Sequence, residues 1–322
     1  MKEIKISKND SGIRFDKYLK KLFINAGSGF LYKMLRKKNI TLNDQKADGK
    51  EILKVGDSVK VFFSDETYNK FTADQNVLSK EFEALKNLKY PKPEIIFENE
   101  DLILYNKPQN LLSQKAKADD ISANEILISY MINQHELTEE DYQTFHPSVC
   151  NRLDQNTTGI LVFGKSMKGL QEMSEALKNR TAHKYYYAIV NGKFTQNGTF
   201  RGYIKKDGAN NTVTVYDIQK DGADYIETGF SMIQYHEKYD FSFIEIELFT
   251  GKTHQIRAHL AQIGHPIIGD YKYGNRSVND RYKANYGICT QLLHAHKIVL
   301  PNLGTFEASL PKDFNRLLDG GI

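Results

Sequence analysis

The stretch CNRLDQNTTGILVFGKS, residues 150–166, places an Arg and an Asp two residues apart in a turn that leads directly into an apolar strand. Asp154 lies where a rigid strand holds a loop residue, which is a common place for functional side chains. An Asp close to Thr and Gly is also a usual turn residue, because its carboxylate can accept backbone hydrogen bonds. The stretch alone therefore leaves two interpretations of Asp154, a turn residue or a catalytic one.

Short strands outnumber helices in the part of the chain that surrounds this stretch. Strands are expected on both sides of the Asn99–Asp101 turn and in TGILVFGKS (158–166), HKYYYAIVNG (183–192) and FSFIEIELFT (241–250). Helices are expected in KGLQEMSEALKNR (168–180) and THQIRAHLAQIG (253–264), and they do not alternate regularly with the strands. We therefore predict an α+β fold with a mixed, mostly antiparallel sheet rather than a doubly wound one.

Composition sets the class of protein. A chain of 322 residues with 40% hydrophobic content can bury a sizeable core and suggests two domains. No apolar run is long enough to span a bilayer and the N-terminus has no apolar signal segment, so we expect a cytoplasmic protein without a membrane partner. Cys150 and Cys289 are too few for a disulfide framework, and their spacing does not suggest structural zinc.

Positive charge is concentrated in residues 1–65, which hold 15 Lys and Arg against 8 Asp and Glu. Such a field suits contact with a phosphate backbone, although a Lys-rich solvated face would look the same. Two helices are expected here, in RFDKYLKKLF (14–23) and SGFLYKMLRKKN (28–39), followed by short strands within 40–63. In the second helix the apolar residues form one stripe and the basic residues the opposite side, with Ser28 as a candidate cap.

Residues 13–63 resemble the S-four RNA-binding domain, a small α+β module shared by many RNA-modifying enzymes. The resemblance implies that the residues facing RNA are Ser28, Lys33, Arg36, Lys37 and Lys38. We accordingly expect an RNA-binding domain over residues 1–65. A polar, irregular linker is expected over 66–93, with one isolated helical stretch in NVLSKEFEALKNL (76–88), and a catalytic domain over 94–322.

Two more stretches bear on Asp154. In KYYYAIVNG (184–192) the strand alternation places Tyr186 on one face and the neighbouring tyrosines on the other. In GKTHQIRAHLAQIGHPIIGDYKYG (251–274), Thr253 can cap a helix and Arg257 adjoins its apolar side. A guanidinium is the natural partner of a carboxylate that must stay ionised in a closed pocket.

Together these stretches resemble the RluA family of pseudouridine synthases. That family has an HRLDxxTSG motif with the catalytic Asp, a KxYxA strand with an active-site Tyr, and a GRTHQIRxHL helix with an active-site Arg. The resemblance, which NKP (106–108) and HPIIGDYKYG also fit, assigns these roles to Asp154, Tyr186 and Arg257. The sequence departs from the family pattern at four places: Asn151, Thr158, Lys252 and Gln109–Asn110.

The resemblance implies isomerisation of uridine in RNA without a cofactor or bound nucleotide. Asp154 would act at the sugar, as nucleophile or as base, and Tyr186 would cover the uracil and serve as a base for a late proton transfer. The uridine must be flipped out of its stack. Further substrate contacts are expected from Arg152, Leu153, Thr157 and His254. Large-subunit ribosomal RNA is the expected substrate and transfer RNA the alternative, and a monomer is expected.

Other patterns have simpler interpretations. GKT at 251–253 lacks the upstream glycine of a phosphate-binding loop, since position 246 is Ile. The pairs His254 with His259 and His294 with His296 lack a third ligand, so no metal site is expected. A non-catalytic RNA-binding protein would not need all three catalytic residue types. A hydrolase would need a second carboxylate near Asp154 or a metal cluster, and neither is evident in the sequence.

Overall fold

The computed structural model describes residues 1–7, 10–72, 75–207, 210 and 212–319, and it confirms the α+β class. The strands are β1 Lys2–Lys5, β2 Ile40–Leu42, β3 Ser58–Val61, β4 Ile95–Glu98, β5 Leu102–Lys107, β6 Ser148–Val149, β7 Thr158–Gly164, β8 His183–Asn191, β9 Gly198–Asp207, β10 Thr212–Tyr216, β11 Asp224–His236, β12 Phe241–Leu248, β13 Leu293–Leu300 and β14 Gly304–Glu307. The helices are α1 Phe15–Leu22, α2 Ser28–Arg36, α3 Asp65–Phe71, α4 Gln75–Lys86, α5 Ala123–Asn133, α6 Glu139–Thr144, α7 Met167–Lys178, α8 Gln255–Gln262, α9 Arg276–Tyr286 and α10 Lys312–Leu318.

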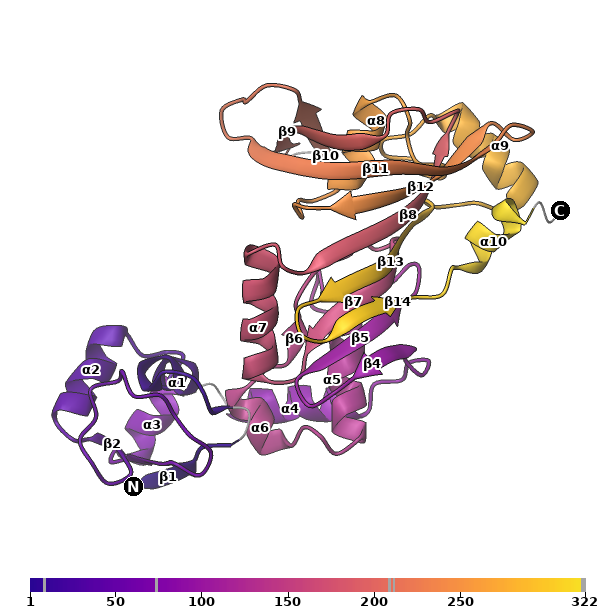
Figure 1. The fold of residues 1–322 in the computed structure, drawn as a ribbon. Coiled ribbons are helices and arrows are strands. Elements are labelled where there is room, and N and C mark those ends of the chain that lie inside the picture. The colour runs from indigo at the N-terminus through magenta and orange to yellow at the C-terminus, as the bar shows by residue number, and fades with distance from the viewer. Residues whose placement is uncertain (8–9, 73–74, 208–209, 211, 320–322) are drawn as a thin grey trace.

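One large sheet organises the chain after β4. Its order is β10-β9-β11-β12-β8-β13-β7-β5-β4, with β14 paired to β13 and β6 paired to β7. The β7–β13 pair is parallel and the other described pairs are antiparallel, which confirms the predicted mixed, mostly antiparallel sheet. Figure 1 shows the sheet running through the larger part of the molecule, with α7 on one side and α10 on the other.

The two faces of this sheet bury different helices. Strand alternation sends Ile103 and Tyr105 into a large core that also contains residues of α4, α5, α8, α9 and α10. Leu102 and Leu104 point the other way, into a smaller core covered by α7. A sheet covered on both faces is rigid, so the loops at its strand ends are held in fixed places.

Residues 1–63 form a separate small unit, drawn in indigo and purple in Figure 1, with the sheet order β1-β3-β2 and a core of its own. Helix α2 buries Leu31, Met34 and Leu35 and exposes its basic side, as its pattern predicts. The predicted cap is wrong. Ser28 is the first residue of α2, Gly27 precedes it, and no side chain caps the helix. Strand β1 was not predicted.

The described residues of the segment 66–93 contain more regular structure than the irregular linker that the sequence predicts. Most of α3 lies in this segment, and its Tyr68 packs into the core of the N-terminal unit. Helix α4 coincides with the predicted helical stretch, but it is not isolated, because Phe82 and Leu85 are buried in the core of the large sheet. The Phe82 ring packs against that of Tyr142, with 5.8 Å between their centroids. None of the helices in the described ranges is both long and apolar enough to cross a membrane.

Candidate active site

Asp154 lies in the turn between β6 and β7, where its backbone and its side chain have different partners. Its carbonyl accepts a hydrogen bond from the Thr157 amide at 3.0 Å, which closes the turn. The preceding Leu153 is fixed by Ser113, whose Oγ donates to the Leu153 carbonyl at 2.8 Å and accepts from its amide at 2.9 Å. Asp154 is thus a turn residue through its backbone, and its carboxylate is left for another role.

A buried lysine ties this turn to the loop after β5. The Lys107 Nζ donates to the carbonyls of Pro108, Leu111 and Gln155 at 3.0, 2.7 and 2.9 Å. Burial lowers the pKa of Lys107 to about 7, and the nearby Asp154 opposes that shift. Lys107 stands out in the sequence only as part of the NKP motif, because its three carbonyl partners are brought to it by the fold.

Arg257, on α8, joins Asp154 to a second carboxylate. Its Nη1 donates to Asp154 Oδ2 at 2.7 Å, while its Nε and Nη2 donate to Asp270 Oδ2 and Oδ1 at 2.7 and 2.9 Å. Burial alone would lower the pKa of Arg257, but Asp270 and Asp154 hold it above its ordinary value. The guanidinium is therefore a permanent cation beside Asp154, in the position that the sequence predicts.

Asp270 corrects the expectation that no second carboxylate lies near Asp154. It is 1% exposed and is held in place by Asn279, whose Nδ2 donates to the Asp270 carbonyl at 2.9 Å. The Asn279 Oδ1 also accepts from the Gly269 amide at 2.8 Å. Both oxygens of Asp270 bind Arg257, so it orients the guanidinium and does not face the substrate as a second acid or base.

The start of α8 differs from the prediction. The helix begins at Gln255, and the residue at its N-cap is His254, not Thr253. His254 has a left-handed backbone with φ of 51°, and its Nδ1 lies 2.8 Å from the Tyr273 hydroxyl oxygen. This conformation turns the ring toward the site, with Nε2 at 4.0 Å from Asp154 Oδ2. The Tyr273 ring also lies 5.3 Å from the Arg257 guanidinium.

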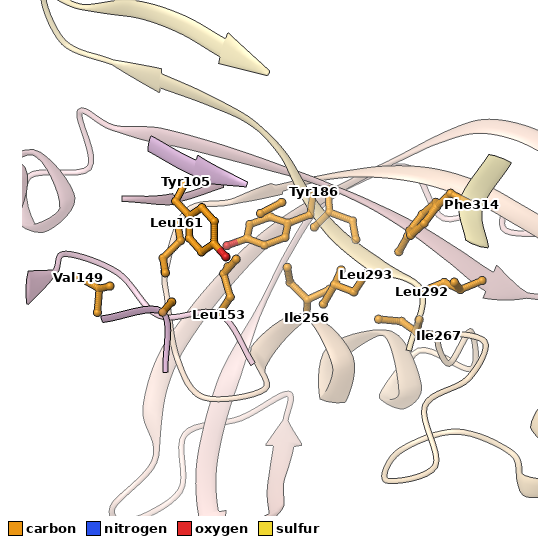
Figure 2. Packing of buried hydrophobic residues seen from close by; sticks show 14 of the residues in the cluster. Tyr105, Val149, Leu153, Leu161, Tyr186, Ile256, Ile267, Leu292, Leu293 and Phe314 are labelled. Carbon is orange, nitrogen blue, oxygen red and sulfur yellow. The ribbon is translucent and has the colours of Figure 1, made fainter. Parts of the chain in front are cut away.

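Tyr186 lies on β8, and its side chain points into the large core of the sheet. Its side chain is 5% exposed and belongs to a cluster with Leu153, Ile256 and Leu293 (Figure 2). Burial, and then the charge of Asp154, raise the pKa of Tyr186 well above its usual value. Its hydroxyl is therefore protonated at neutral pH.

These side chains line a cleft of about 870 Å³. Among the described residues, Asp154 is the only Asp or Glu that lines this cleft. The cationic residues of the lining are Lys115, Arg152, Lys184, Lys206, Lys252, Arg257 and Lys272. A cleft with this charge attracts a polyanion, and its volume is that of a site that encloses a small ligand or one flipped base.

The structure places the site residues predicted after residue 94 in one cleft. The residues predicted in the N-terminal unit lie outside the lining of that cleft. Arg152, Leu153, Thr157 and His254 line the cleft with the three predicted catalytic residues. Arg152 is exposed, whereas Leu153 and Thr157 are 6% and 2% exposed. The five predicted RNA contacts of the N-terminal unit are exposed on α2 and just after it, outside the cleft lining: Ser28, Lys33, Arg36, Lys37 and Lys38.

The histidines of the two predicted pairs contact hydroxyl or carboxylate groups of the protein. His259 contacts the Thr228 hydroxyl at 3.1 Å, and His294 contacts that of Thr158 at 2.8 Å. His296 contacts Glu245 at 3.0 Å. Among the residues that the structure describes, no three His, Cys, Asp or Glu side chains form a candidate metal site.

Comparison with known proteins identifies the family. The family model for RNA pseudouridylate synthase matches residues 101–262. An uncharacterized RNA pseudouridine synthase of Mycoplasma genitalium is 31% identical, over 93% of this chain and 89% of its own. A ribosomal large subunit pseudouridine synthase C of Rickettsia felis is 30% identical, over 89% of this chain and 88% of its own.

Solved structures share the fold. Human RNA pseudouridylate synthase domain containing 4 matches with a TM-score of 0.57 at 22% identity, over 76% of this chain and 95% of its own. The chain belongs to the RNA pseudouridylate synthase family. Within that family it is RluA-like, and it is an isomerase that acts on RNA.

Proposed function

We propose that this enzyme converts specific uridines of large-subunit ribosomal RNA to pseudouridine, with Asp154 as the essential catalytic residue. The observation that carries the assignment is the Asp154 carboxylate, held at 2.7 Å by Arg257 in a cleft whose other charged lining residues are Lys and Arg. The names of the Rickettsia relatives, ribosomal large subunit pseudouridine synthase C, support the choice of ribosomal RNA.

The reaction explains why a carboxylate is placed there. The bond between uracil N1 and ribose C1′ must break, the base must turn, and C5 must bond to C1′. The Asp154 carboxylate can either attack C1′ or remove the proton from C2′, and the hydrogen bond from Arg257 at 2.7 Å holds it in place for both. Tyr186 covers the base. Its raised pKa favours this covering role over the general-base role, because a base must be unprotonated.

We propose further that residues 1–65 are an S-four-like RNA-binding domain and residues 94–322 the catalytic domain, in a monomeric cytoplasmic protein that needs no cofactor. The separate core of the N-terminal unit supports this division. The exposed basic side of α2 supports its binding to RNA phosphates. Arg152, Leu153, Thr157 and His254 would contact the flipped nucleotide in the cleft.

Removing the basic side of α2 is expected to weaken RNA binding and to reduce its salt dependence. In the triple variant Lys33→Ala, Arg36→Ala, Lys37→Ala, affinity should fall by roughly tenfold or more and the slope of log K against log salt by up to ~2–3, because fewer counterions are released. Titration of labelled RNA at several salt concentrations measures both.

The matched control for this variant removes three exposed lysines from the larger part of the chain: Lys178, Lys238 and Lys312. It has the same net charge as the α2 variant, so equal losses in the two variants would show a general charge effect. An unchanged salt slope in the α2 variant would remove α2 from the RNA interface.

The direct test of the function is tritium release from RNA labelled at uridine C5, without any added cofactor. We expect release from large-subunit ribosomal RNA by the intact protein and none by Asp154→Ala. Unmodified transfer RNA, assayed in parallel, distinguishes the substrate classes, since release from it alone would overturn the ribosomal assignment. Binding of both RNAs without release would overturn the catalytic proposal.

A further inference from the structure

Three residues from separate segments form a hydrogen-bonded chain that ends beside Asp154. The Val213 amide, on β10, donates to the Tyr273 hydroxyl oxygen at 2.9 Å. The same oxygen lies 2.8 Å from His254 Nδ1, and the other ring nitrogen, Nε2, lies 4.0 Å from Asp154 Oδ2. His254 is thus held at one nitrogen, while its other nitrogen faces the site.

The partners of Tyr273 decide which nitrogen of His254 carries the proton. The hydroxyl accepts from Val213, so its own proton needs an acceptor, and His254 Nδ1 is within hydrogen-bond distance. If Nδ1–H donated instead, the proton of the half-buried Tyr273 hydroxyl would have to bond to solvent, because its hydrogen-bond partner besides Val213 among the described residues is His254. The neutral ring therefore has its proton on Nε2, directed toward the space beside Asp154.

The surroundings keep both groups in these states. Burial raises the pKa of Tyr273, so its hydroxyl is protonated and can donate. Burial lowers the pKa of His254, against the pull of Asp154, so the ring is neutral at pH 7. The Asp270 Oδ1 accepts from the Tyr273 amide at 3.2 Å, so the residue that orients Arg257 also fixes Tyr273.

The reaction needs such a donor. When the bond to ribose breaks, negative charge develops on the uracil and spreads to its carbonyl oxygens, where a fixed N–H can stabilise it. Three of the five N–H groups of Arg257 are already bound to Asp154 and Asp270. The 4.0 Å gap between His254 and Asp154 is too long for a hydrogen bond, so Nε2–H is left for the substrate.

We propose that His254 donates its Nε2–H to a carbonyl oxygen of the departing uracil and that Tyr273 is a positioning residue that fixes this tautomer. This inference rests on the proposed function, since it assigns a role in uracil departure. It also connects the site to β10, because the Val213 amide donates to the Tyr273 hydroxyl oxygen.

The first test reads the tautomer in the free protein and does not depend on activity. Nitrogen NMR of ring-labelled histidine distinguishes protonated from unprotonated ring nitrogens, and the His254→Gln variant assigns the signal. We expect Nδ1 of His254 to be unprotonated in the wild type and the preference to be lost in Tyr273→Phe. A proton on Nδ1 in the wild type would overturn the proposal.

The second test compares two substitutions of His254, each of which replaces one ring nitrogen with a side-chain amide nitrogen. The side-chain amide of Gln reaches the place of Nε2, whereas that of Asn reaches the place of Nδ1. Single-turnover rates on saturating RNA should fall by about 10²-fold in His254→Asn, clearly less in His254→Gln, and by about tenfold in Tyr273→Phe. RNA affinity should fall by less than about threefold in all three, because phosphate contacts dominate it.

Equal rates for the Gln and Asn variants would overturn the donor role. A rate for Tyr273→Phe within twofold of the wild type would overturn the positioning role. If the wild type released no tritium at all, the proposed function would fail while the tautomer measurement kept its meaning. The two failures are therefore distinguishable.

Discussion

Asp154→Asn is expected to abolish pseudouridine formation, with a loss of at least about 10⁴-fold in the single-turnover rate. The amide keeps the size of the side chain and can still accept a hydrogen bond from Arg257, but it can neither attack C1′ nor take a proton. Because Arg257 keeps both of its bonds to Asp270, the local structure should be retained. RNA affinity should therefore change by less than about threefold, since the phosphate contacts that dominate it are untouched.

Tritium release under single-turnover conditions, together with RNA binding on the same preparation, tests this expectation. Gln155→Ala is the matched control, since it alters an exposed neighbour in the same turn and leaves its carbonyl available to Lys107. The control should react at nearly the wild-type rate. Product from Asp154→Asn at a tenth of the wild-type rate or more would end the catalytic assignment, and a parallel loss of RNA binding would point to misfolding.

The sequence predicted those parts of the site that depend on local pattern. Alternation along β8 predicted that Tyr186 and the neighbouring tyrosines point to opposite faces, and Tyr186 is buried in the large core whereas the Tyr185 hydroxyl contacts Glu247 of β12 at 3.2 Å. Helical spacing placed Arg257 next to the apolar side of its helix, and Ile256 beside it is buried. These signals are periodic, so a few neighbouring residues are enough to detect them.

The rest of the site depends on contacts between distant segments. Arg257 and Asp154 are 103 residues apart in the chain, and the Tyr273 hydroxyl meets the amide of Val213 across 60 residues. The role of Asp270 has no local signal, because an Asp after Gly resembles an ordinary turn residue. The cap of α8 also has no local signal. The sequence suggested Thr253, whereas His254 occupies the N-cap position with a left-handed backbone.

The Arg257–Asp270 pair illustrates how stability and catalysis can be separated at this site. Arg257→Gln is expected to lower the free energy of unfolding by about 3–5 kcal/mol, because Asp270 is 1% exposed and would lose its buried cation. The variant should also lose activity by roughly 10³-fold or more, because the Asp154 carboxylate loses the charged hydrogen-bond partner that holds it in place. Urea unfolding and tritium release measure the two effects.

The double variant Arg257→Gln, Asp270→Asn decides between a structural and a catalytic role for Arg257. Two neutral amides can hydrogen-bond to each other, so most of the lost stability should return, as is common when both members of a buried ion pair are replaced. Activity should stay low, because neither amide supplies a charge to Asp154. If activity returned together with stability, Arg257 would serve only to neutralise Asp270, and the positive charge near Asp154 would have to come from other cations that line the cleft, such as Lys272.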